Sequence, residues 1–391
     1  MFSLKKLLFS IALCWSFLGF SQVDTFSQST KISILTCGPG TELYSTFGHS
    51  AFRVWDPMTQ KDYVYNYGTF DFTAPNFYLN FVKGKLIFKL DKQEFPRFLF
   101  EYQYEKRWVT EHILNLTPEQ KTKLINFLEN NALPENREYK YDFFFDNCAT
   151  KILSVLKEVY KNDINFKSEH LKTTYTFREL LDQKLSANSW ASVGIDFALG
   201  SKIDKKATPL EHSFLPDYTL LQLKNTTLNS KSLINSKRTV LKTQESDYTI
   251  SFLGTPLFVF SVILLFTLYI TYLNVKNKSW SKWLDVLLLS ITGLAGVILL
   301  ILWFATEHTA TAKNYNLLWA VPINIVPILY LTIKKQWPNW LSKYCLFLLL
   351  FLVNILIINF VGIQKFHPIF IPLLLSLAAR YVFLWQRTKL T

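Results

Sequence analysis

Apolar and polar positions are distributed differently in the two halves of this chain. Up to about residue 248, short apolar runs alternate with polar stretches, which is typical of a water-facing α+β domain. After Ile250 five apolar runs follow one another, each near the length that crosses a bilayer as a helix. The runs cover residues 251–273, 284–304, 315–333, 345–362 and 368–385. The pattern predicts a soluble domain followed by an all-α membrane domain of five transmembrane helices.

The first half predicts strands and helices in turn. Alternating and β-branched positions favour strands at 31–36, 47–55, 63–67, 81–86, 88–90 and 106–114. Thr117 to Gln120 has the form of a capping box, which predicts a helix over 124–133. The spacing of apolar residues predicts further helices over Ala149 to Tyr160 and over 176–185.

The two ends of the soluble domain are set by a predicted leader and a predicted linker. Residues 1–22 combine two lysines, an apolar run and a short polar end, which is the layout of a secretory signal peptide. Residues 226–249 are rich in Ser, Thr, Asn and Lys, and are interpreted as a linker into the membrane domain at 250–391. The soluble domain is therefore expected to cover 23–225 and to be exported to the periplasm.

Basic residues indicate how the chain would cross the inner (cytoplasmic) membrane. They follow the first, third and fifth apolar runs, whereas the alternate loops carry only Lys313 and Lys365. Cytoplasmic loops carry the excess of Lys and Arg in membrane proteins. We therefore expect the N-terminal domain in the periplasm and the C-terminus in the cytoplasm.

Composition changes this picture little. Half of the residues are hydrophobic and the net charge is +13. Signal and loop lysines account for part of that charge, so it indicates a membrane rather than a nucleic-acid partner. The sequence contains no Gly-rich phosphate loop and no paired zinc motif. Asp196 and Asp204 provide too few ligands for a metal ion. Neither a cofactor nor a metal is expected.

Of four cysteines, Cys148 is the candidate nucleophile. It opens a predicted helix, where the unpaired backbone N–H groups and the positive end of the helix dipole stabilise a thiolate. Cys14 lies in the predicted signal peptide and Cys345 in a predicted span. A structural disulfide between Cys148 and Cys37 is the alternative, because export favours disulfides, and it would silence the nucleophile.

His49 is the candidate base for the Cys148 thiol. It lies on a short strand that follows a glycine, where alternation points His49 to one face and Ser50 to the other. Asn66, on the next predicted strand, would accept the imidazole N–H and fix its tautomer. Spacing alone does not give the pairing register, so Tyr65 stays open as the third polar residue.

Two candidates for substrate binding lie beside His49. Ser50 is its neighbour in the chain, and Arg53 follows four residues later on the same strand face. A guanidinium matches the oxygens of a phosphate headgroup with two hydrogen bonds. The alternative for Arg53 is an ion pair with a local carboxylate. The carboxylates considered are Asp71, Asp142 and Asp146.

Two more candidates come from elsewhere in the chain. Asn147 would donate to the oxyanion of an acyl transfer, or it is an ordinary N-cap of the helix that Cys148 opens. His308 lies in the polar stretch 305–316 between two predicted spans, on the expected periplasmic side. It would help to position a lipid headgroup, or it belongs to an ordinary solvated loop.

Several segments together resemble a known family. The order of a histidine strand and a later Asn-Cys helix start is similar to that of circularly permuted papain-like (NlpC/P60-type) domains. More closely, the chain resembles the Lnb family of lipoprotein N-acyltransferases, and the resemblance extends into the membrane half. The segments that carry it are Gly48 to Arg53, Tyr65 to Phe72, Pro134 to Arg137, Tyr141 to Thr150, Asp196 to Gly200 and Asp204 to Asp217.

The resemblance implies a two-step acyl transfer. Cys148 would take an acyl chain from a phospholipid donor as a thioester, and the α-amino group of a diacylated lipoprotein would accept it. A cysteine peptidase or amidase that cuts cell-wall peptides is the alternative, because one fold supports both activities. Five spans favour a lipid substrate, since a peptidase needs one anchor at most. A non-enzymatic envelope protein is a third possibility.

Overall fold

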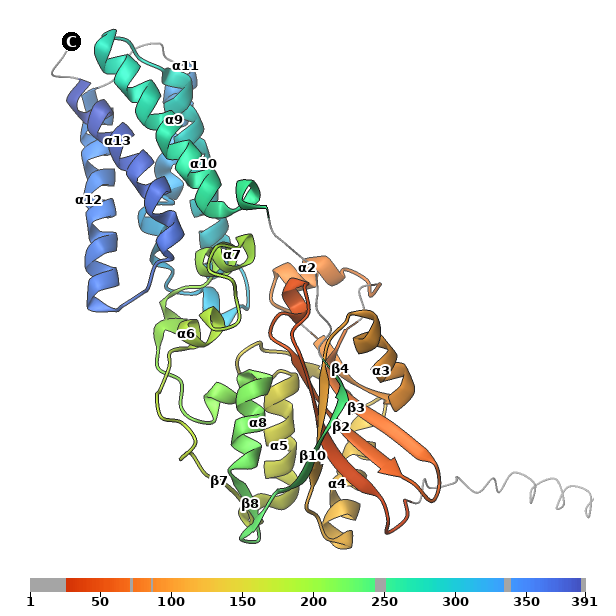
Figure 1. Cartoon of the computed structure of the whole chain (residues 1–391). Helices are drawn as coiled ribbons and strands as arrows, with labels where there is room; N and C mark the ends of the chain where they lie inside the picture. Colours follow the sequence, from red (N-terminus) through yellow and green to blue (C-terminus); the bar gives the residue numbers. More distant parts are fainter. Residues whose placement is uncertain (1–25, 71–72, 86, 243–250, 334–338, 388–391) are drawn as a thin grey trace, which may run out of the picture.

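The computed structural model describes residues 26–70, 73–85, 87–242, 251–333 and 339–387. The predicted signal peptide, with Cys14, lies outside the described residues. The described chain forms a soluble domain built on a sheet and a bundle of long helices, with α7 (Trp190–Ala198) lying between the two (Figure 1).

The soluble domain is built on a seven-stranded sheet with the order β10-β5-β1-β2-β3-β4-β6. Neighbouring strands pair antiparallel throughout. The ladder between β2 and β3 ends at Phe52 and Tyr65, so the N-terminal end of β2, with His49, extends beyond it. The strands are β1 (Lys31–Cys37), β2 (His49–Asp56), β3 (Lys61–Thr69), β4 (Ile87–Glu94), β5 (Val109–Leu114), β6 (Glu138–Lys140) and β10 (Ile234–Leu241).

Helices cover both faces of this sheet. α4 (Pro118–Ala132), α5 (Cys148–Tyr160) and α8 (Pro216–Lys224) pack over the face that presents Phe52 and Tyr65, and bury the main core. α3 (Phe95–Tyr104) packs over the opposite face, with Ala51 and Val64. Figure 1 shows α5 and α8 on one side of the sheet and α3 on the other. Ala51 and Phe52 point to opposite faces of the sheet because successive side chains alternate along a strand.

The structure corrects two predictions for this domain and adds one helix. Part of the strand predicted at 81–86 is helical, in α2 (Phe77–Val82), and the helix α3 was not predicted. Residues 226–241 are not a linker, because they form β8 (Thr226–Leu228), β9 (Lys231–Ser232) and β10. Their side chains Leu228 and Leu233 are buried in the main core, which outweighs the polar composition of the segment.

The remaining short elements connect these layers. β7 (Ile164–Phe166) pairs with β8 in a small second sheet, and α6 (Phe177–Asp182) precedes α7. The 3₁₀ turns are η1 (Leu43–Ser45), η2 (Lys161–Asp163), η3 (Ser201–Asp204), η4 (Glu211–Phe214), η5 (Phe252–Gly254), η6 (Thr309–Thr311), η7 (Tyr315–Leu318), η8 (Pro322–Asn324) and η9 (Pro368–Phe370).

Four helices are long and apolar enough to cross a membrane. They are α9 (Pro256–Lys276), α10 (Lys282–Phe304), α12 (Asn339–Val361) and α13 (Ile371–Arg387). The third predicted run is not one helix, because η8 and α11 (Ile325–Ile333) meet the preceding segment at a bend of 52°. Pro322 disfavours helical geometry in the residue before it. The described chain therefore has four spans, or five if the bent pair counts as one.

The polar loop between α10 and η7 joins the two parts of the molecule. The Glu307 carboxylate lies 2.6 Å from Lys140 Nζ, and the Glu307 N–H donates to the Lys83 carbonyl. Ala310 accepts from the Gly200 N–H at 2.9 Å. This loop is polar because its groups are paired with the soluble domain.

Candidate active site

Cys148 is the first residue of α5, and Asn147 is the N-cap that fixes this helix start. The Asn147 Oδ1 accepts from the N–H groups of Ala149 and Thr150, at 2.8 and 2.9 Å. Its Nδ2 donates to the carbonyls of Phe143 and Phe214, at 2.7 and 2.8 Å. Both ends of the amide are therefore engaged. The oxyanion role considered for Asn147 is wrong, and the N-cap alternative holds.

His49 and Asn66 lie side by side at the open end of β2 and β3. The His49 Nε2 is 2.6 Å from Asn66 Oδ1. A carbonyl oxygen only accepts, so Nε2 donates and Nδ1 keeps the lone pair that a base needs. The ring of His49 also hydrogen-bonds to Cys148. Tyr65 points into the main core instead and donates its hydroxyl to Glu129, so Asn66 and not Tyr65 contacts the imidazole.

The surroundings of the two ionisable groups favour a charged pair. Burial raises the pKa of the Cys148 thiol, but the His49 charge, its hydrogen bond and the N–H groups of Ser50 and Ala149 outweigh burial, so the pKa is lowered. Burial lowers the pKa of His49, but the charge of Cys148 and hydrogen bonds to Cys148 and Asn66 raise it above its usual value. Thiolate and imidazolium therefore stabilise each other.

The second cysteine of the soluble domain behaves differently. Cys37 pairs with His49 across β1 and β2, yet Cys37 and Cys148 are both free thiols. The disulfide considered from the sequence is therefore absent from the described structure. Burial raises the pKa of Cys37 to about 12, which makes it a poor nucleophile.

Arg53 does not face a substrate. Its side chain is buried, with 4% of the residue exposed, and all three guanidinium nitrogens bind carboxylates. The partners are Asp62 and Glu111, neither of which was among the carboxylates considered from the sequence. The guanidinium also stacks on Phe95 at 3.4 Å. The headgroup role predicted for Arg53 is wrong, because no nitrogen is left for a phosphate.

Ser50 and His308, the other two predicted binding residues, lie in different surroundings. The Ser50 side chain is fully buried, its hydroxyl has no hydrogen-bond partner among the described residues, and its backbone N–H hydrogen-bonds to the Cys148 sulfur. The His308 Nε2 is 3.1 Å from the carbonyl oxygen of Phe81, which ties the outer loop to α2. His308 therefore makes a contact between the two parts of the molecule.

Two residues at the site were not predicted. Gly68 has a φ of +89°, and a Cβ there would lie 3.4 Å from Cys148 Cβ and 3.8 Å from its backbone N. The Tyr139 hydroxyl lies 3.8 Å from the same point. That hydroxyl is buried and has no hydrogen-bond partner among the described residues. A glycine inside a strand signals close approach of another backbone, so Gly68 was detectable, whereas nothing marks Tyr139.

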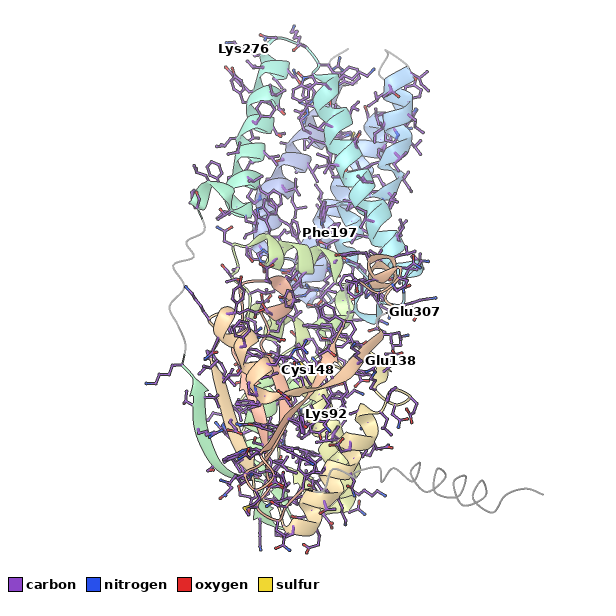
Figure 2. The ribbon with its side chains drawn as sticks, turned by 90° about the vertical axis from the view of Figure 1, so that its right-hand side faces the viewer. Lys92, Glu138, Cys148, Phe197, Lys276 and Glu307 are labelled. Atoms are coloured by element: carbon purple, nitrogen blue, oxygen red, sulfur yellow. The ribbon has the colours of Figure 1, made fainter. Side chains whose placement is uncertain are left out.

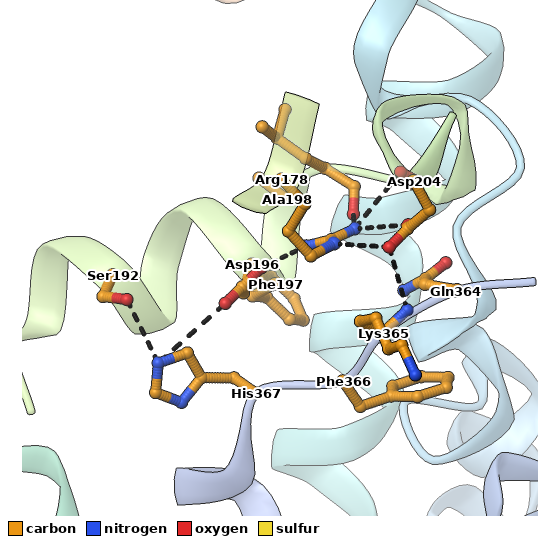
Figure 3. A network of polar contacts seen from close by, with 12 residues as sticks. Arg178, Ser192, Asp196, Phe197, Ala198, Asp204, Gln364, Lys365, Phe366 and His367 are labelled. Carbon is orange, nitrogen blue, oxygen red and sulfur yellow. Dashed lines mark hydrogen bonds and ion pairs between the residues drawn. The ribbon is translucent and has the colours of Figure 1, made fainter. Parts of the chain in front are cut away.

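The carboxylates Asp196 and Asp204 do not form a metal site. Both bind the buried guanidinium of Arg178, as Figure 3 shows. Within the part of the chain that the structure describes, no three His, Cys, Asp or Glu side chains are grouped to hold a metal ion.

The site lies in the part of the soluble domain that faces the helix bundle. In Figure 2, Cys148 stands between Lys92, deeper in the soluble domain, and Phe197 of α7, next to the long helices. Phe143 and Phe144, shortly before Cys148 in the chain, pack with Phe214 in an aromatic cluster. The outer loop touches the same region, because Thr309 hydrogen-bonds to Asp142 at 3.3 Å.

Fold and site together define a membrane protein whose soluble domain holds a paired cysteine and histidine close to the bundle. Residues 20–183 match the family model of the Lnb N-terminal periplasmic domain, and residues 247–389 match that of the Lnb transmembrane domain. The chain therefore belongs to the Lnb family, which confirms the resemblance. No curated protein and no solved structure matches the chain. Family membership indicates an inner-membrane enzyme of lipoprotein processing with a periplasmic domain.

Proposed function

We propose that this chain is a membrane-bound lipoprotein N-acyltransferase that works through a cysteine thioester. Its donor is a phospholipid, and its acceptor is the α-amino group of a diacylglyceryl-cysteine lipoprotein. The observation that carries the proposal is a helix-start thiol of lowered pKa, hydrogen-bonded to a histidine that Asn66 orients. The membrane half supports a lipid rather than a peptide as the donor.

In the first step the Cys148 sulfur attacks the carbonyl carbon of a phospholipid ester. The sulfur–carbon bond forms, the ester carbon–oxygen bond breaks, and the imidazolium of His49 gives its proton to the leaving glycerol oxygen. The products are a lysophospholipid and an acyl thioester on Cys148. The lowered thiol pKa supports this step, because the thiolate is the attacking species.

In the second step the lipoprotein amine attacks the thioester. The carbon–nitrogen bond forms, the carbon–sulfur bond breaks, and neutral His49 accepts the amine proton. This step restores the thiolate–imidazolium pair. Asn66 holds the His49 ring in one tautomer through both steps and acts as a positioning residue.

The developing oxyanion needs donors that are in place before the reaction. We assign this role to the backbone N–H of Cys148 and to the Tyr139 hydroxyl. Gly68 supports the assignment, because its missing side chain leaves the space in front of both groups open. The unpartnered state of the Tyr139 hydroxyl within the described residues is costly unless a ligand uses it.

The same proposal includes a topology and a fold. The His49 strand precedes the Cys148 helix, and α5 packs against β2 and β3, which supports a circularly permuted papain-like domain of the NlpC/P60 type. Residues 1–22 would be removed as a signal peptide, and the periplasmic domain would extend to about residue 241, the end of β10. The charged loops support a cytoplasmic C-terminus.

The test is mass spectrometry of intact lipoprotein N-termini from cells with the wild-type chain, with Cys148→Ala, with Cys345→Ala and with no copy. We expect a third acyl chain on the N-terminal amine with the wild type and with Cys345→Ala only. The Cys345 variant controls for loss of a buried thiol far from the site. N-termini that are the same in all four strains would overturn the proposal and favour a peptidase or amidase acting on cell-wall peptides.

A further inference from the structure

An apolar cavity lies between α7 and the membrane helices α9, α10 and α13. Its volume is about 390 Å³, within the range of about 300–1,000 Å³ that is common for small-molecule sites. Two threonines, Thr267 and Thr292, are among its lining residues, and the others are apolar. A cavity of this character accepts a hydrocarbon rather than a polar headgroup.

One face of α7 forms the wall of the cavity on the side of the soluble domain. Trp190, Val193, Gly194 and Phe197 line it, at the spacing that places four residues on one helix face. A Cβ on Gly194 would meet no atom within 4 Å, so this glycine leaves part of the cavity open.

The neighbouring face of α7 is held in place by polar contacts, which Figure 3 shows. Asp196 binds the guanidinium of Arg178, and Ser192 hydrogen-bonds to His367 at 3.1 Å. His367 comes from the segment that leads into α13. Because one contact reaches the soluble domain and the other the bundle, α7 is a fixed wall.

The cavity reaches into the helix bundle and borders on its lipid-facing surface. Its lining on α10 runs from Leu284 to Ala295, twelve residues whose eleven steps rise about 16 Å in an α-helix. These residues lie in the half of α10 that is farther from the outer loop, whereas α7, which contacts that loop through Asn314 and the Phe197 carbonyl, lines the opposite end of the cavity. The lining therefore extends over more than half of the length of the bundle. Phe266 on α9 and Leu287 and Ile291 on α10 line the cavity and are still 46%, 47% and 54% exposed. A lipid chain can therefore enter between α9 and α10.

We propose that this cavity holds the fatty acyl chain that the phospholipid donor gives to Cys148, and that it limits the length of that chain. This inference rests on the proposed function. Lipid tails are as apolar as the lining side chains, so moving a chain from the bilayer into the cavity gains little from the hydrophobic effect. The cavity therefore selects by shape and length.

The position of α7 connects the cavity to the thiol. While one face of α7 lines the cavity, Ile195 and Leu199 pack against the aromatic cluster that contains Phe144. Phe144 lies four residues before Cys148, and Phe143 beside it accepts a hydrogen bond from the N-cap Asn147. The wall of the cavity and the start of the nucleophile helix thus share one packed unit.

The first experiment reduces the cavity from two sides. Gly194→Leu fills it from α7 and Ala295→Phe from α10, while Leu294→Phe, on the exposed face of α10, is the matched control. The readout is the chain-length distribution of the N-linked acyl group on lipoproteins. In both cavity variants we expect the ratio of long to short chains to fall about tenfold or more, as when a hydrophobic pocket rejects extra methylenes. The control should keep the wild-type distribution.

The second experiment measures binding apart from turnover. Full-length Cys148→Ala in phospholipid nanodiscs is irradiated with phosphatidylethanolamine that carries a diazirine in mid-chain. We expect crosslinks on α7, α9 and α10, and fewer of them when Gly194→Leu is added. The same diazirine on a diacylglyceryl lipopeptide is the comparison, and crosslinking there by the lipopeptide alone would overturn the donor assignment.

The outcomes separate this inference from the proposed function. Unchanged chain lengths in both cavity variants, with N-acylation that still needs Cys148, would overturn the cavity role and leave the acyltransferase intact. N-acylation that does not need Cys148 would overturn the acyltransferase itself.

Discussion

Two buried polar clusters of this molecule differ in how completely their groups are paired. Around Arg178, every guanidinium nitrogen binds Asp196, Asp204 or a backbone carbonyl, and Asp204 also accepts from the Lys365 N–H. Around Cys148, the sulfur hydrogen-bonds to His49 and to the N–H groups of Ser50 and Ala149, and the nearby Tyr139 hydroxyl has no partner among the described residues. Burial and charge are common to both clusters. They differ in that the guanidinium of Arg178 is fully paired, whereas a hydroxyl without a partner among the described residues lies beside the Cys148 thiol.

The difference indicates what each cluster is for. A buried ion pair with all of its bonds satisfied fixes neighbouring elements, here α6 and η3 of the soluble part against the segment before α13. A thiol of lowered pKa beside an unused donor can stabilise charge that appears only during a reaction. Three measurements test the comparison.

The largest effect is expected for Arg178→Met. Removing the guanidinium leaves Asp196 and Asp204 buried without their cation, which should lower the free energy of unfolding by about 3–5 kcal/mol. Thermal unfolding of the purified full-length chain measures this. Lys184→Met is the control, because its partner Asp217 is nearly half exposed and the loss should be at most about 1 kcal/mol. Equal free energies of unfolding for the two variants would contradict the structural role of the Arg178 cluster.

The next effect is expected for Tyr139→Phe. Loss of one oxyanion donor should lower the acyl-transfer rate per folded molecule about 10²-fold, which is about 2.7 kcal/mol. Stability should not fall, because the hydroxyl has no partner among the described residues to lose. Tyr65→Phe is the matched control, since that hydroxyl donates to Glu129 and its loss should affect stability rather than rate. A wild-type rate in Tyr139→Phe would refute the donor role.

The smallest effect is a shift in pH dependence for His49→Ala. The imidazolium lowers the pKa of the Cys148 thiol against burial, so its removal should raise that pKa. The alkylation of Cys148 by iodoacetamide is measured as a function of pH. The curve of rate against pH should keep its shape, and its midpoint should move to higher pH. His308→Ala should leave the midpoint in place, because that ring contacts α2 instead. If the midpoint of the pH profile were unchanged in His49→Ala, His49 would not be the group that lowers the pKa of the thiol.

Much of the soluble domain could be predicted because its signals are local. Strong β-formers and alternation identified the strands of His49 and Asn66, and the capping box at Thr117 is present as expected. The helix that Cys148 opens was also predicted from apolar spacing. α3 was missed because its run of aromatic residues has no strong helix propensity and is stabilised by packing on the sheet.

The candidate site was predicted less completely than the elements that carry it. Arg53 shares a strand face with His49, as alternation requires, but that face is covered at Arg53 by Phe95 and by two carboxylates. Those partners come from β3 and β5, so only the register of pairing decides that they meet. The same reason explains why Tyr139, on the far strand β6, gave no signal.

Sequence by itself determined the two-part organisation, the family, and the candidate cysteine and histidine, because these depend on composition and on neighbours along the chain. Tertiary structure decided that Asn66 rather than Tyr65 meets His49, that residues 226–241 complete the soluble domain, and that the third apolar run bends. It also decided that α7 closes an apolar cavity. Each of these features depends on contacts between residues far apart in the chain. A local sequence pattern carries no information about the free energy of such contacts.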